Sequence, residues 1–286
     1  MHTPPHAMKS QTLWGLSSGG FHRLHLTEWG DIANPRVLIC AHGLTRCGRD
    51  FDTLARKLAA DYRIFCPDTV GRGESDWLAN KSGYDYAQYM ADAAVVLAHT
   101  GAREVHWIGT SMGGILGMVL AALPRSPITR LVVNDVGFHI PKASLERIGA
   151  YLGQSPAFQS LDEVIAAVRQ VSPFGNLSEM QWRDYTVPLV KQGEDGLWRF
   201  RYDPGIGETF RQAAQTDIDL SAYWQAIRCP VLLTRGAESD LLLHSTFESM
   251  CAKPGVRGIE FSNVGHAPMF HNDEQIDAVR EFLLGE

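Results

Sequence analysis

The chain has 286 residues, of which 45% are hydrophobic and 20% charged, a composition typical of soluble globular proteins. This length fits one large α/β domain, or a domain that carries an insertion. The formal net charge of -6 and the lack of a basic run argue against a nucleic-acid partner. No run of about 18 apolar residues occurs, so we expect no membrane span.

The cysteines and the first residues bear on the cellular compartment. The five cysteines are widely spaced and form no CxxC pair, which favours free thiols in a reducing compartment. The first residues, MHTPPHAMKSQ, lack the apolar region of a signal peptide, and we expect the first ten or so to form a loose tail. We therefore predict a cytoplasmic protein. Its histidines show no metal-binding spacing, so no metal or organic cofactor is expected.

Apolar runs alternate with helical patterns along the first part of the chain. The alternating residues 21–30 predict an exposed antiparallel strand. The elements predicted after it are strands over 36–43, 63–68, 104–110 and 128–135, and helices over 50–62, 86–101 and 112–123. This alternation is typical of βαβ units and a parallel sheet covered on both faces.

The pattern changes after residue 136. Four helical segments, without a convincing buried strand, occupy residues 137–225. Strands are predicted again over 229–236 and 256–263, followed by a helix over 272–284 with Asn272 as its cap. We therefore predict a core domain made of residues 1–136 and 226–286, with a helical insertion over 137–225.

A single serine stands where a predicted strand turns into a predicted helix, in the stretch WIGTSMGGILG. Gly109 precedes Ser111 by two positions and Gly113 follows it by two. In a sharp turn the neighbouring strand and helix would clash with a side chain at either glycine. The turn exposes the serine Oγ and leaves the amide of Met112 at a helix N-terminus. This predicts a nucleophile and half of an oxyanion hole, with an N-capping serine as the simpler alternative.

A serine nucleophile needs a base, and the base needs a carboxylate to orient it. Asp240 follows one late strand and His266 follows the next, so both lie at the strand ends where α/β sheets bind ligands. The chain order is serine, aspartate, histidine. The turn CAHGLT leaves the first buried strand and offers the amide of Leu44 as the second oxyanion donor.

The chain resembles the α/β-hydrolase fold family from about Phe21 onward. The motifs that agree are HG at 42–43, PDTVGRGESD at 67–76, GTSMGG at 109–114, RGAESD at 235–240 and GHAPM at 265–269. The resemblance implies a mostly parallel eight-stranded sheet with helices on both faces and a helical cap inserted after the sixth strand. It also implies the roles of the site residues: Ser111 as nucleophile, His266 as base, Asp240 as acid, and the amides of Leu44 and Met112 as oxyanion donors.

Other residues near these motifs have competing interpretations. Asp135 also ends a strand and is the alternative acid, since some relatives place the acid there; we otherwise expect it to be a buried hydrogen-bonding group. His42 is expected to be structural, as are Asp68 and Ser75 in the loop over 67–76. Arg46 could meet a substrate carboxylate, but a salt bridge to the loop near Asp76 is the simpler expectation.

The departures from known subfamilies narrow the chemistry. The serine elbow disfavours haloalkane dehalogenases and epoxide hydrolases, and the HGGG turn of many lipases is absent. We predict a serine hydrolase that cleaves carboxylic esters or lactones of small molecules through an acyl-enzyme. A cofactor-free haloperoxidase or perhydrolase, a C–C bond hydrolase and a non-enzymatic small-ligand receptor remain alternatives.

Overall fold

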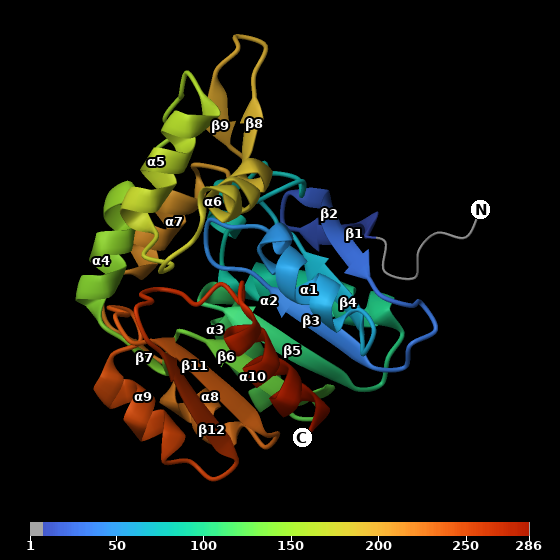
Figure 1. Cartoon of the computed structure of the whole chain (residues 1–286). Coiled ribbons are helices and arrows are strands. Elements are labelled where there is room, and N and C mark those ends of the chain that lie inside the picture. Colours follow the sequence, from blue (N-terminus) through green and yellow to red (C-terminus); the bar gives the residue numbers. More distant parts are fainter. Residues whose placement is uncertain (1–7, 286) are drawn as a thin grey trace.

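The computed structural model describes residues 8–285, which contain an eight-stranded sheet with strands in the order β1-β2-β4-β3-β5-β6-β11-β12 (Figure 1). These strands are β1 (Lys9–Ser17), β2 (Gly20–Trp29), β3 (Val37–Ala41), β4 (Arg63–Pro67), β5 (Val105–Thr110), β6 (Ile128–Asn134), β11 (Val231–Gly236) and β12 (Val256–Phe261). β1 and β2 pair antiparallel, as do β2 and β4, and the other neighbours pair parallel. The predicted α/β-hydrolase sheet is confirmed.

The burial of the strands explains the patterns in the sequence. Every residue of β3 and of β11 is buried, because helices cover both faces of the sheet centre. β3 is therefore apolar throughout, and the polar residues of β11 form hydrogen bonds. β2 alternates between exposed and buried residues over its first half. β1, which was not predicted from the sequence, forms a hairpin with β2 at the sheet edge, in which nine residues of each strand pair. Lys9 and Ser10 therefore belong to a strand, and only residues 1–7 of the expected tail lie outside the described part.

Helices cover the two faces of the sheet. α1 (Asp52–Leu58) and α10 (Asp273–Leu284) share one apolar cluster on the face that is in front in Figure 1. α2 (Tyr86–Thr100), α3 (Met112–Ala122), α8 (Ser221–Ala226) and α9 (His244–Cys251) contribute to the cluster on the other face. Asn272 caps α10 by accepting a hydrogen bond from the amide of Gln275, as predicted. Gly101 ends α2 with φ 68°, also as predicted.

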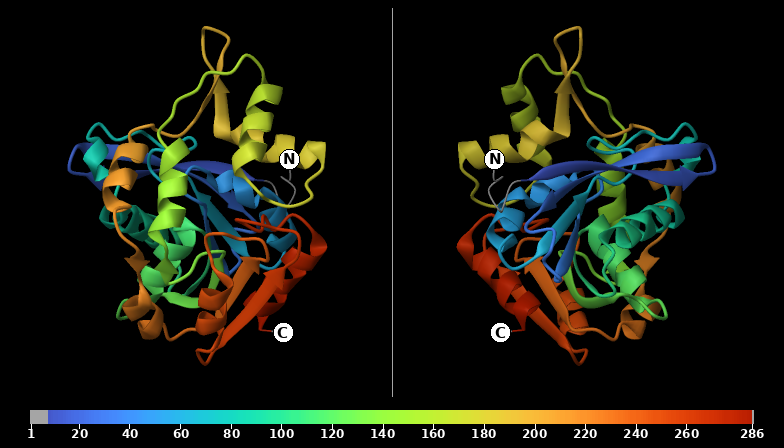
Figure 2. Two further views of the ribbon diagram at one scale, coloured as in Figure 1. Left: turned by 90° about the vertical axis from the view of Figure 1, so that its left-hand side faces the viewer. Right: turned by 90° about the vertical axis from the view of Figure 1, so that its right-hand side faces the viewer.

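The chain between β6 and β11 forms a separate group of short elements. It contains α4 (Lys142–Tyr151), α5 (Leu161–Val171), α6 (Glu179–Thr186) and α7 (Ile206–Ala213), which match the four predicted helical segments. It also contains two strand pairs that were not predicted from the sequence: β7 (His139–Ile140) with β10 (Ile218–Asp219), and β8 (Val190–Gln192) with β9 (Trp198–Phe200). Figures 1 and 2 show α5, α6 and the β8–β9 hairpin standing above the sheet.

The described residues also form three short 3-10 helices, η1 (Gly48–Phe51), η2 (Lys81–Gly83) and η3 (Val187–Leu189). Within residues 8–285, no helix is both long enough and apolar enough to cross a membrane. All five cysteines are free thiols, and Cys40, Cys47 and Cys66 are buried.

Candidate active site

Ser111 occupies the sharp turn between β5 and α3. Its backbone angles, φ 53° and ψ -116°, lie in a region that residues with side chains rarely adopt. A Cβ atom added to Gly109 would lie 2.0 Å from the carbonyl oxygen of Gly113, and one added to Gly113 would lie 2.1 Å from that of Ala41. The reason predicted for the two glycines, a clash with neighbouring backbone, is thus present in the structure.

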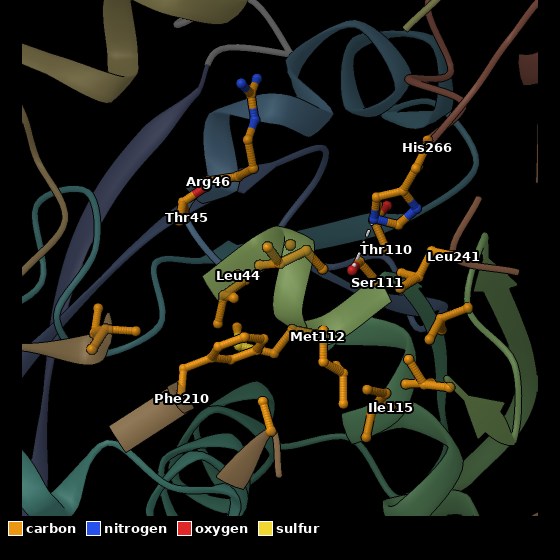
Figure 3. A pocket seen from close by; sticks show the side chains of 18 of the residues that line it. Leu44, Thr45, Arg46, Thr110, Ser111, Met112, Ile115, Phe210, Leu241 and His266 are labelled. Carbon is orange, nitrogen blue, oxygen red and sulfur yellow. Dashed lines mark hydrogen bonds between the residues drawn. The ribbon is translucent and has the colours of Figure 1, made fainter. Parts of the chain in front are cut away.

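A hydrogen-bonded chain of three side chains begins at Ser111. The Oγ of Ser111 lies 3.1 Å from Nε2 of His266, as the dashed line in Figure 3 shows. The Nδ1 of His266 lies 2.7 Å from Oδ2 of Asp135. Because an ionised carboxylate only accepts hydrogen bonds, Nδ1 carries the proton and Nε2 is free to accept one from the serine. This geometry can activate Ser111 as a nucleophile.

Asp135 is held by two further donors. It follows β6 with φ 56° and is completely buried. Its Oδ1 accepts a hydrogen bond of 3.0 Å from the amide of Gly236, and its Oδ2 accepts one of 2.7 Å from the hydroxyl of Ser239. Together with His266, these donors satisfy a carboxylate that would otherwise be costly to bury. The role of Ser239, which stands directly before Asp240, was not predicted from the sequence.

The prediction that Asp240 orients His266 is wrong. The side chain of Asp240 is 55% exposed and pairs with Arg147 of α4 at 2.8 Å. Its backbone carbonyl accepts a hydrogen bond from Ser144, also in α4. The loop after β11 turns inward one residue earlier, so that Ser239 rather than Asp240 reaches the interior. The carboxylate beside His266 is therefore the alternative that the sequence left open, Asp135.

The two predicted oxyanion donors, Leu44 and Met112, belong to the turn after β3 and to the start of α3. Met112 is the first residue of α3, so its N–H precedes the hydrogen-bonded ladder of the helix. Leu44 lies in a turn that the amide of Arg46 closes on the carbonyl of Gly43 at 3.1 Å. Leu44, Ser111 and Met112 line the same cavity, and their oxyanion role remains a prediction.

The residues expected to be structural hold the loop over 67–76 against the turn at Gly43. Nδ1 of the buried His42 donates to the Gly43 carbonyl at 2.7 Å, and Nε2 accepts from the amide of Thr69 at 2.9 Å. Burial lowers the pKa of His42, in keeping with a neutral ring that uses both nitrogens in this way. Ser75 donates to the backbone carbonyl of Asp68 at 2.6 Å.

Asp68 accepts hydrogen bonds from His25, at 2.8 Å, and from the amides of Gly48 and Glu74, at 2.7 and 2.9 Å. Burial favours the neutral acid, but these hydrogen bonds outweigh it and hold the pKa of Asp68 below its usual value. Asp68 thus connects the backbone segments around the turn, and its carboxylate forms no hydrogen bond with Ser111 or His266.

Arg46 does not reach the loop near Asp76. Its Nε and Nη2 donate to the two oxygens of Asp50 at 2.8 and 2.6 Å, and Nη2 also donates to the Tyr185 carbonyl at 3.1 Å. The guanidinium lies 5.2 Å from the ring centre of Phe174. The predicted salt bridge to the Asp76 region is wrong, because Asp76 pairs with Arg23. Arg46 instead connects the turn after β3 to α6.

A cavity of about 220 Å³ opens in front of Ser111 and His266 (Figure 3). Much of its wall comes from the chain between β6 and β11, and these residues are mostly apolar: Ile140, Leu145, Ile148, Tyr151, Phe174, Ile206, Phe210, Ala213, Ala214 and Ile218. Within residues 8–285, no group of three or more His, Cys, Asp or Glu side chains is arranged to hold a metal ion. The cavity therefore presents an apolar wall to a serine nucleophile.

The sequence profile of the alpha/beta hydrolase family matches residues 38–279. The chain belongs to the alpha/beta hydrolase family. It is 46% identical over 280 residues to the 3-hydroxybutyrate-oligomer hydrolase of Cupriavidus necator, an alignment that covers 94% of this chain and 96% of that protein. The predicted activity is confirmed at the level of the class: this family member is a hydrolase of carboxylic esters.

Solved structures agree with this placement in the family. An alpha/beta hydrolase from Novosphingobium aromaticivorans is 36% identical and superposes with a TM-score of 0.86 over 96% of this chain and 98% of that one. A structure from Rickettsia typhi is 30% identical, with a TM-score of 0.91 over 98% of this chain and 99% of that one. Both superpositions cover nearly the whole of each chain, so this fold has counterparts of similar length.

Proposed function

We propose that this family member hydrolyses short oligomers of 3-hydroxybutyrate, releasing hydroxy acid units through an acyl-enzyme on Ser111. The observation that carries the proposal is the Ser111–His266–Asp135 chain, which faces an apolar cavity in a protein so similar to the Cupriavidus necator enzyme. The reaction is a narrower case of the ester hydrolysis that the sequence predicts, and a small-molecule substrate needs no nucleic-acid or membrane partner.

The chemistry of such an oligomer suits the cavity. Each repeating unit has an ester carbonyl next to a methylene group and a methyl branch, so the chain is largely apolar between its polar ester groups. Apolar walls select a ligand by shape and by the area that it buries. The apolar residues contributed by α4 and α7 are suited to pack against these methyl branches. We therefore assign residues 137–225 the role of a cap that encloses the substrate.

The first chemical step is acylation. The Oγ of Ser111 attacks an ester carbonyl while Nε2 of His266 takes its proton, and Asp135 holds the ring and favours the resulting imidazolium. The carbonyl oxygen becomes negatively charged, and the amides of Leu44 and Met112 are the donors proposed for it. His266 then returns the proton to the alkoxide of the shortened oligomer, which leaves as an alcohol. The acyl group remains on Ser111 as an ester.

Deacylation repeats the same steps with water. His266 takes a proton from a water molecule as that water attacks the acyl-enzyme carbonyl, and the collapse of the second tetrahedral intermediate returns the proton to Ser111. The products are one carboxylic acid and one alcohol for each water consumed. In both steps the proton moves only between Ser111, His266 and the reactants. The proposed mechanism uses no metal and no organic cofactor, as expected from the sequence.

The free thiols favour a reducing compartment, and we propose the cytoplasm. Burial raises the pKa of the Cys47 and Cys66 thiols well above the usual value, so these groups stay protonated and unreactive at neutral pH.

Incubation with the dimer and trimer of (R)-3-hydroxybutyrate should release the monomer, measured by liquid chromatography. The insoluble polymer should be a poor substrate, because the cap restricts access to the nucleophile. Ser111→Ala is the matched control and should release no monomer above the rate without enzyme. An enzyme that cleaves p-nitrophenyl esters but leaves both oligomers intact would contradict the proposed substrate and leave the triad standing.

An organophosphate or sulfonyl fluoride should label Ser111 and no other residue. The reagent mimics the acylation step, so it reports the nucleophile independently of any substrate. Intact-mass measurement should show one adduct per chain, and peptide mapping should place it on Ser111. An adduct on another residue, or none in a protein that still hydrolyses esters, would refute the assignment of the nucleophile.

A further inference from the structure

Arg72 is a fully buried arginine in the loop that follows β4. Its residue exposure is 0%, and among the described residues it takes part in no ion pair. It lies in PDTVGRGESD, one of the motifs that the chain shares with the family. No role was predicted for Arg72 from the sequence. A buried charge is costly unless it is paired or well solvated by dipoles, so an arginine kept in this state calls for an explanation.

The two glycines beside Arg72 let the loop turn the side chain inward. Gly71 has φ 84°, and a Cβ there would lie 2.5 Å from the Tyr84 ring. Gly73 has φ 55°, and a Cβ there would lie 2.3 Å from Oδ2 of Asp68. Both positions combine a left-handed backbone with a close neighbour, which only glycine accommodates. The two glycines of the sequence GRG therefore allow the arginine side chain between them to point into the interior.

The guanidinium is solvated by carbonyls and tyrosines. Nη1 donates to the carbonyl of Val70 at 2.8 Å and to the hydroxyl of Tyr89 at 2.9 Å. The charge also lies 4.8 Å from the ring centre of Tyr89 and 5.8 Å from that of Tyr84. Aromatic faces and carbonyl oxygens stabilise a cation without neutralising it. The full positive charge of Arg72 thus remains in the interior.

The same guanidinium contacts both residues assigned to the oxyanion hole. Its Nε donates to the carbonyl of Leu44 at 2.8 Å, and its Nη2 lies 3.8 Å from Sδ of Met112. The hydrogen bond holds the carbonyl group of Leu44 in place, and the N–H of the same residue is the proposed oxyanion donor. The Met112 contact places the cation behind the start of α3. Leu44, Met112, Tyr84 and Tyr89 also line the substrate cavity, so the charge lies just behind its wall.

We propose that Arg72 is a positioning residue of the oxyanion site, which fixes the Leu44 turn and adds a positive potential where negative charge develops during acyl transfer. The inference rests on the proposed function. A buried cation affects a neutral ester little, but it stabilises the oxyanion, because charge interactions are strong where water is excluded. Arg72 should therefore lower the barrier to reaction and contribute little to substrate binding.

The test compares Arg72→Met, which keeps the length but not the charge, with Arg72→Lys, which keeps the charge. With p-nitrophenyl butyrate, Arg72→Met should lower kcat by about 10- to 100-fold and change KM by less than about threefold. The inhibition constant of a trifluoromethyl ketone, whose adduct on Ser111 carries the oxyanion, should rise by the same factor as kcat falls. Arg72→Lys should recover at least about tenfold of the lost kcat.

Ser75→Ala is the matched control, because it loosens the same loop without touching the guanidinium. It should keep kcat within about threefold of the parent protein. A kcat for Arg72→Met within that range, an equal loss in Ser75→Ala, or an unchanged ketone affinity would each overturn the proposal.

Circular dichroism and thermal melting establish which variants fold. If Arg72→Met does not fold, a folded Arg72→Lys tests the proposal alone. A kcat within about tenfold of the parent value supports a role for the positive charge, and a greater loss contradicts that role. Activity of the parent that persists in Ser111→Ala would instead refute the underlying mechanism. That outcome is distinct from a Ser111-dependent enzyme that does not respond to changes at Arg72.

Discussion

Asp135→Asn should lower kcat by roughly 10⁴-fold, while Asp240→Asn should leave it within about twofold of the parent protein. In the parent, Asp135 accepts the Nδ1 proton of His266 at 2.7 Å and so leaves Nε2 free to take the Ser111 proton. The amide group of asparagine can donate toward Nδ1, which places the ring proton on Nε2. The serine then has no base.

Steady-state kinetics on p-nitrophenyl butyrate measure both variants, and thermal melting shows whether each keeps its fold. Asp240→Asn is the matched control because it makes the same change in the carboxylate that the sequence favoured. It removes an exposed ion pair with Arg147, which is worth little to stability. A large loss of kcat in Asp240→Asn, with Asp135→Asn fully active, would show that Asp240 is the acid of the triad and Asp135 is not.

The sheet was predictable because the pattern of apolar residues in its central strands reflects how these strands are buried. β3 reads VLICA and is buried throughout, as expected for a central parallel strand between two helical layers. β1 was harder to predict, because it lies at the sheet edge and most residues of KSQTLWGLS are exposed or half-buried, which leaves no continuous apolar run. The β8–β9 hairpin was missed for a similar reason: its strands have three residues each, too few for periodicity to appear.

Ser111 and His266 were predictable because each stands in a local motif that constrains the backbone. The acid was not, since Asp135 and Asp240 both follow strands of the same sheet, and both strands end at the same edge. The choice between them depends on how a loop of four residues turns after β11. In the structure this loop directs Ser239 inward, to donate to Asp135, and leaves Asp240 beside α4. No pattern within either motif encodes that turn.

Arg72 illustrates a different limit. The sequence places an arginine between two glycines, a pattern equally suited to an exposed turn. Its burial depends on Tyr84 and Tyr89, which receive the guanidinium, and on the Leu44 carbonyl, which comes from a distant part of the chain. Only when these parts are packed together does the arginine lie behind the substrate cavity.

Gly109→Ala should reduce kcat by at least about 100-fold, because the elbow cannot keep its geometry with a side chain at that position. The added Cβ would lie 2.0 Å from the carbonyl oxygen of Gly113. Both atoms are attached to the backbone, so no rotation of a side chain relieves the clash. The turn must shift, and Ser111 moves with it relative to His266 and the amide of Met112. Stability should fall as well, since β5 and α3 are packed in the centre of the core.

Gly149→Ala in α4 is the matched control, because its Cβ would meet only side-chain atoms at 3.5 Å or more. That substitution should raise stability by up to about 1 kcal/mol, as alanine favours a helix interior, and leave kcat near the parent value. Rates of p-nitrophenyl butyrate hydrolysis and thermal melting curves test both variants. A Gly109→Ala protein with parent-like kcat would show that the turn tolerates a Cβ, and that the glycine is not what holds Ser111 in its strained position.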